Sequence, residues 1–170
     1  MYTQEHLLTI LNKLLKLSGE SELVEFKKAE NSFSDSDLGE YFSALSNEAN
    51  LKGVSCAWLV FGVDDKTHQV QGTNYKPSKL ALDAMKKKIG DQTTNRITFE
   101  EIHEIEYKGH RVVMFEIPAA PHGIPVAYKG HYYGRDGSSL VALNIVEIER
   151  IRNQGMDASF EMSLAKDNLS

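Results

Sequence analysis

The chain has 170 residues, of which 41% are hydrophobic and 25% are charged, and its formal net charge is −5. This length suits one well-buried domain and leaves too little chain for a second full one. The acidic balance does not match the strongly basic composition of a dedicated nucleic-acid binder, so a contact with nucleic acid must be a local patch. The lone Cys56 cannot form an internal disulfide, which favours a reducing cytoplasm. No apolar run approaches the roughly 20 residues that cross a bilayer, so we expect no membrane partner.

Helix and strand patterns alternate along the first third of the chain. Leucines at helical spacing predict an N-terminal helix within residues 1–18, with Thr3 as its N-cap and Gly19 as its stop. A short strand follows from Leu23 to Lys27. Ser36 or Asp37 can then cap a second helix, whose apolar face carries Leu38, Tyr41, Phe42, Leu45 and Ala49.

The most apolar stretch, Val54 to Val63, predicts a central strand that is covered on both faces. His68 to Gln71 can return beside it as a short hairpin arm. A third helix opens at Pro77 and reaches Gly90. Its last turns carry Lys86, Lys87 and Lys88, where cations suit the helix macrodipole.

Two hairpins and a last helix complete the predicted domain. Turn signals at Lys108-Gly109-His110 and Lys129-Gly130 separate strand candidates at Ile97–Tyr107, Arg111–Ile117, Ile124–Tyr128 and His131–Tyr133. The last helix runs from about Leu143 to Arg152. We therefore predict one α+β domain over residues 1–154, in which a mixed, largely antiparallel sheet is flanked by helices. Residues 155–170 lose periodicity and are predicted to be a linker or docking arm that leads to further domains.

Three carboxylates stand at the ends of predicted strands: Glu20, Glu25 and Asp64. Charged residues at strand ends can converge, and convergent carboxylates bind a hard cation such as Mg²⁺ that activates water for phosphodiester attack. Asp65 can act as an outer-shell acid. The competing interpretation is ordinary, because Glu20 can be an acid before a strand and Asp64 a turn residue.

The order of several short motifs resembles the Schlafen AlbA-like domain family. The matching segments are Glu20-Ser21, Glu25-Phe26-Lys27, Ala44-Leu45-Ser46-Asn47, Phe61-Gly62-Val63-Asp64-Asp65, Ile117-Pro118, Pro125-Val126 and Tyr133-Gly134-Arg135-Asp136-Gly137-Ser138-Ser139. The resemblance spans about Glu20 to Arg152. One departure is Ala49-Asn50-Leu51-Lys52-Gly53, which has a single glycine where many relatives carry a pair.

The resemblance implies two different functions. Bacterial members are regarded as DNA-binding parts of transcriptional regulators or divergent ATPases, with partner domains further along the same chain. In nuclease-active Schlafens, acids that match Glu20, Glu25 and Asp64 bind divalent metal, Mg²⁺ or Mn²⁺, and cut structured RNA. A lysine that matches Lys27 then stabilises a phosphate oxygen.

Other residues bear on binding and cofactors. Phosphate contacts are predicted at Lys27, Lys28, Lys52, Lys86, Lys87, Lys88, Lys129 and Arg135, although a lysine-rich helix end is often merely solvated. Arg135 can equally brace its turn through a salt bridge to an acid. One cysteine and scattered histidines predict no structural zinc, and the absence of a Walker loop predicts no ATP site.

Three functional hypotheses remain open at the level of sequence. The first is a DNA-binding module of a bacterial transcriptional-regulator-like protein. The second is a metal-dependent endoribonuclease, so whether the chain is an enzyme stays undecided. The third is a purely structural or homo-oligomerising domain.

Overall fold

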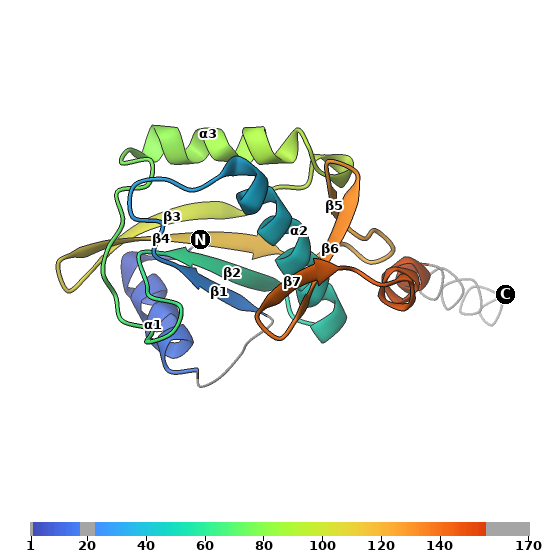
Figure 1. Ribbon diagram of the computed structural model, residues 1–170, viewed down its shortest axis with the longest axis horizontal. Coiled ribbons are helices and arrows are strands. Elements are labelled where there is room, and N and C mark those ends of the chain that lie inside the picture. The colour runs from blue at the N-terminus through green and yellow to red at the C-terminus, as the bar shows by residue number, and fades with distance from the viewer. Residues whose placement is uncertain (1, 18–22, 156–170) are drawn as a thin grey trace, which may run out of the picture.

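A mixed four-stranded sheet forms the centre of the molecule (Figure 1). The structure, a computed structural model, describes residues 2–17 and 23–155. The strands lie in the order β1-β2-β4-β3, with bounds Val24–Lys27, Cys56–Phe61, His110–Pro118 and Glu101–Tyr107. Strand β1 runs parallel to β2, whereas β2 with β4 and β4 with β3 are antiparallel. The predicted α+β class is confirmed.

Helices cover both faces of this sheet (Figure 1). Helix α1 (Gln4–Leu15) packs on one face, and α2 (Asp35–Lys52) and α3 (Lys79–Gly90) pack on the other. Thr3, Ser34 and Ser78 cap them by accepting a hydrogen bond from the amide three residues on. The Thr3 cap was predicted, whereas a cap at Ser36 or Asp37 was wrong. Ser34 caps α2, because Asp35 and Asp37 already lie in its first turn and favour the macrodipole there.

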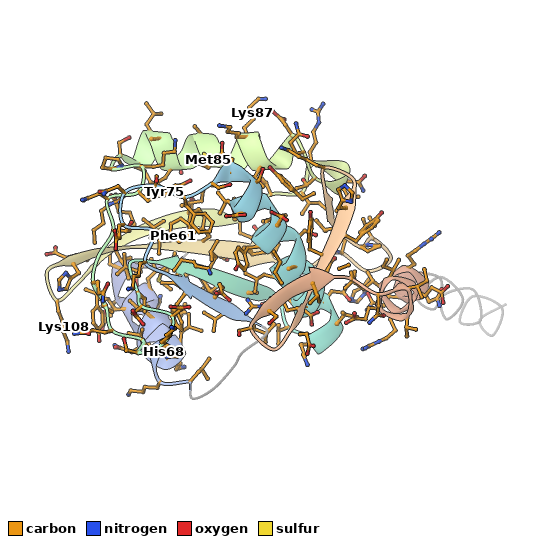
Figure 2. The ribbon with its side chains drawn as sticks, in the orientation of Figure 1. Phe61, His68, Tyr75, Met85, Lys87 and Lys108 are labelled. Carbon is orange, nitrogen blue, oxygen red and sulfur yellow. The ribbon has the colours of Figure 1, made fainter. Side chains whose placement is uncertain are left out.

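Strand β2 is buried on both sides, as predicted. Trp58 and Val60 pack toward α1, and Leu59 and Phe61 pack toward α2 and α3. In Figure 2, Phe61, Tyr75 and Met85 lie between the sheet and the helices above it. Burial of these side chains, together with the rest of the two apolar clusters, stabilises the packing of the helices on the sheet.

A small second sheet consists of β5 (Ala127–Tyr128), β6 (His131–Asp136) and β7 (Ser139–Ala142). The predicted Lys129-Gly130 turn is confirmed, and the predicted Lys108-Gly109-His110 turn is one residue shorter, because His110 begins β4. Both are two-residue turns with positive φ at each residue. Strand β7 was not predicted, because its residues are exposed or half-buried and form no buried face.

The last described element is a helix over residues 145–155. Asn144 and Glu147 start it with reciprocal bonds between side chain and amide, which is a capping box. Residues 156–170, which include most of the predicted arm, lie outside the described residues. None of the described helices is long and apolar enough to cross a membrane.

Candidate functional site

Glu25 lies at the centre of a buried polar cluster. It stands on β1 opposite Leu59, and its residue is 7% exposed. Its Oε2 atom accepts a hydrogen bond from Arg135 Nη2 at 2.7 Å, and its Oε1 atom lies 3.4 Å from Lys27 Nζ. The Arg135 side chain is fully buried, so this pair is shielded from solvent and salt.

Glu48 brings a second buried carboxylate to the same cluster. Its Oε1 atom accepts a hydrogen bond from the Arg135 amide at 3.1 Å, and the residue is 2% exposed. Gly134 allows this approach, since a Cβ there would come within 2.9 Å of Leu143 and 3.4 Å of Glu48. We call Glu25, Lys27, Glu48 and Arg135 the Glu25 cluster.

Lys27 is the solvent-facing member of the Glu25 cluster. Its ammonium lies 5.2 Å from the centre of the Tyr41 ring, and its side chain is 30% exposed. Burial alone would lower the pKa of Lys27, but a hydrogen bond with Tyr41 and the charge of Glu25 raise it above its ordinary value. Lys27 therefore remains a cation that can meet an anionic ligand at the cluster.

Asp64 lies apart from the Glu25 cluster. It follows β2 by three residues, whereas Glu25 is inside the β1–β2 ladder. The Thr67 and Lys66 amides donate to Asp64 Oδ1, and Lys28 lies 3.2 Å from Oδ2. These bonds hold the pKa of Asp64 well below its usual range. The carboxylate thus closes a turn, which is the ordinary role weighed beside the catalytic one.

The third predicted acid, Glu20, lies outside the described residues. Within residues 2–17 and 23–155, no three His, Cys, Asp or Glu side chains are grouped to hold a metal ion. Both oxygens of Glu25 already face cations, so a metal would have to displace Arg135 or Lys27 from them. The described part of the chain therefore does not fit a divalent cation by itself.

Sequence reasoning missed Glu48 and the buried polar face of α2. Asn47 Nδ2 donates to the carbonyls of Val126 and Tyr133, both at 2.9 Å, and Ser43 Oγ donates to Val126 at 2.7 Å. Asn50 Nδ2 donates to the Ala120 carbonyl at 2.7 Å. The Ser46-Asn47 and Pro125-Val126 segments carried the family resemblance, and they were the available signal for this interface.

The predicted phosphate contacts fall into separate places. Lys87 and Lys88 lie in the last turn of α3, and Lys129 stands in the β5–β6 turn next to the end of that helix. We call these three residues the α3–β5 surface. The Lys129 amide donates to the Gln92 carbonyl at 2.8 Å, which fixes the turn against the helix end. Lys129 Nζ lies 5.5 Å from the centre of the Tyr128 ring, and the Lys87 side chain is 83% exposed. Figure 2 shows Lys87 on the outer side of α3, away from the sheet.

The remaining predicted contacts do not join the α3–β5 surface. Lys86 lies 2.7 Å from Glu101, and Lys28 pairs with Asp64 at the far end of β1. Lys52 ends α2. Arg135 makes the predicted salt bridge to an acid, and its burial keeps it away from an external phosphate.

The fold resembles that of a solved bacterial protein. The search of curated proteins finds no match. The structure of the DIP2311 protein from Corynebacterium diphtheriae aligns with a TM-score of 0.60 at 18% identity, covering 89% of this chain and 29% of that one. The solution structure of the N-terminal domain of a RecG-related protein from Nitrosomonas europaea aligns with a TM-score of 0.46 at 21% identity, covering 82% of this chain and 92% of that one.

The DIP2311 likeness concerns the fold, and this chain spans less than a third of that protein. The family model described as Schlafen, AlbA_2 matches residues 20–144. That match includes β1 to β7 and every member of the Glu25 cluster. The chain therefore belongs to the Schlafen AlbA_2 family.

Proposed function

We propose that this chain is a nucleic-acid-binding domain that takes duplex DNA at the α3–β5 surface, in a protein that regulates transcription. The observation that supports it is that the turn carrying Lys129 is bonded to the end of α3, whose last turn carries Lys87 and Lys88, in an otherwise acidic chain. Lysines on a solvated surface meet phosphates as point charges. Tyr132, on β6 and 37% exposed, is the exposed aromatic nearest to Lys129 in sequence and can stack on a base.

Neighbouring acids limit the strength of this binding. Asp91 lies 2.7 Å from Lys87 Nζ, and Asp35 lies 2.5 Å from Lys88 Nζ. Three lysines that each meet one phosphate predict a slope of about −3 for log affinity against log salt concentration. We therefore expect weak binding that disappears at high salt.

The test is fluorescence anisotropy with a labelled DNA duplex and a labelled RNA hairpin across a salt series. In the double variant Lys87→Glu/Lys129→Glu, the slope should flatten by about two units and the affinity should fall at least tenfold at low salt. The matched control is Lys13→Glu/Lys16→Glu, which makes the same charge change at the C-terminal end of α1. An equal loss in both double variants would contradict the α3–β5 surface and leave only a dependence on net charge.

A second candidate function is metal-dependent cleavage of structured RNA at the Glu25 cluster. Two buried carboxylates beside two cations form the kind of strongly interacting polar site that often marks function. The family resemblance supports the same assignment, although the described residues do not complete a metal site. RNA incubated with Mn²⁺ or EDTA tests it: cleavage that requires Mn²⁺ and disappears in a folded Glu25→Gln variant would support the nuclease. Cleavage that persists in that variant would remove Glu25 from the mechanism.

A further inference from the structure

Strand β3 forms an outer edge of the four-stranded sheet. Tyr107 pairs with His110 across a two-residue turn, and such a turn makes this pair hydrogen-bonded in both directions. Hydrogen-bonded pairs then alternate along the ladder. The backbone groups of Ile102, Glu104 and Glu106 therefore point away from β4.

Side chains form hydrogen bonds with the outward-pointing backbone groups in only the first part of this edge. Lys79 Nζ donates to the Ile102 carbonyl at 2.5 Å, and Glu101 Oε1 accepts from the Ile102 amide at 3.0 Å. Gln4 Nε2 donates to the Glu104 carbonyl at 3.3 Å. Among the described residues, the Glu104 amide and both backbone groups of Glu106 have no hydrogen-bond partner. An edge with unpaired groups is a template for another strand.

A groove of about 510 Å³ runs beside these unpaired groups. It is lined by Gln4, Pro77, Glu104, Ile105, Glu106, Gly109 and Arg111. In Figure 1 the tip of the β3–β4 hairpin extends beyond both α1 and α3, so neither helix covers the last part of β3. Figure 2 shows Lys108 at this tip, far from Lys87 and the α3–β5 surface.

The two sides of the edge differ in chemistry. Ile105 packs into the apolar cluster under α1, so a strand added beside it would place alternate side chains next to apolar groups. Glu104 and Glu106 stand on the other side. Arg111 Nε lies 2.6 Å from Glu104, whereas Glu106 is exposed and makes no ion pair among the described residues. The open side of the edge therefore carries net negative charge.

We propose that the outer edge of β3, from Glu104 to Tyr107, binds an extended polypeptide segment in which basic and apolar residues alternate. The segment adds a strand to the sheet, with its basic side chains beside Glu104 and Glu106 and its apolar ones beside Ile105. A second copy of β3 is a poor occupant, because it would set glutamates against glutamates. This interaction is separate from nucleic-acid binding, which uses the opposite end of α3.

The probe is the acetylated and amidated peptide Lys-Val-Lys-Val-Lys-Val, with Glu-Val-Glu-Val-Glu-Val as its charge control. At saturating lysine peptide, NMR should show amide exchange slowed at least tenfold at Glu104 and Glu106, with no change at Val112 on the inner strand. Unchanged exchange at both glutamates would overturn the proposal. Equal protection by the glutamate peptide would overturn the assignment of a basic partner. Protection that rises with protein concentration alone would assign the edge to a second copy instead.

Two variants distinguish the contribution of backbone hydrogen bonds to peptide binding from that of the glutamate charge. Glu106→Pro removes an amide that points away from β4, so the sheet should stay folded while peptide protection at Glu104 is lost. Glu106→Lys keeps the amide and should weaken binding of the lysine peptide about tenfold. The Val112 and Met114 amides, which point toward β3, report whether each variant keeps the β3–β4 ladder. Undiminished binding by a folded Glu106→Pro variant would contradict strand addition.

Discussion

Replacing Arg135 by methionine should destabilise the domain through the charge that it leaves on Glu25. The Arg135 side chain is fully buried and that of Glu25 is 8% exposed, so solvent cannot compensate for the lost cation. Breaking a buried ion pair from one side costs about 3–5 kcal/mol. Lys27 stays 3.4 Å from the other oxygen of Glu25, so we expect the lower end, about 3 kcal/mol. For a chain of this size that corresponds to a fall in melting temperature of about 10 °C.

Urea unfolding followed by circular dichroism measures this cost. Arg152→Met removes an exposed arginine and is the matched control, with an expected change within about 0.5 kcal/mol. Adding Glu25→Gln to Arg135→Met removes the stranded charge and should restore at least 1 kcal/mol of the loss. A cost below about 1 kcal/mol for Arg135→Met, or strictly additive effects in the double variant, would refute the reasoning.

Two further changes test other parts of the fold. Gly39→Ala should destabilise the domain by about 1–3 kcal/mol in urea unfolding, although alanine has the better helix propensity. The reason is that the new Cβ would lie 2.1 Å from the Tyr128 ring. An unchanged unfolding midpoint would show that this ring moves aside at little cost. Burial alone would raise the pKa of Glu101, but hydrogen bonds from Lys86, the Ile102 amide and Lys79 hold it at about 2. This depressed pKa predicts a stabilisation that is present above the unfolded value of about 4.3 and is lost as the pH falls toward 2. In urea titrations, the difference in unfolding free energy between wild type and Glu101→Gln, at most about 1 kcal/mol, should therefore narrow over that pH range. A difference that stays constant would contradict this prediction.

Hydrophobic periodicity in the sequence predicted the helices and strands that bury one face or both faces in the core. The run from Val54 to Val63 identified β2 because both of its faces are apolar, and leucine spacing identified α1. The same reasoning missed β7, whose residues are exposed or half-buried and therefore show no alternation. Helix boundaries were displaced where several capping residues follow one another, as at Ser34 to Asp37.

The candidate site was only partly predictable, for a related reason. Spacing pointed to Glu25 and the family resemblance added Lys27, but neither could show that Arg135, 110 residues further on, supplies the partner of Glu25. It also placed Asp64 with Glu25, whereas the turn amides of Lys66 and Thr67 hold Asp64 beyond the strand end. Pairings between distant segments depend on tertiary packing, which local patterns do not encode.

The polar face of α2 explains why the family resemblance pointed to buried polar residues that hydrophobic periodicity missed. An amphipathic pattern assigns Asn47 and Glu48 to solvent, yet both are buried, because their side chains bind the backbone of the segment from Val126 to Arg135. Buried amide and carboxylate groups that lose such partners carry a penalty of about 1–3 kcal/mol each. Specific hydrogen bonds, and not apolar packing alone, therefore hold the small sheet against α2. Those contacts also bring Arg135 to Glu25, so the Glu25 cluster exists only when the small sheet is docked. A ligand that displaces Arg135 from Glu25 must therefore act on the docking of the small sheet, and any change that loosens that sheet must alter the cluster.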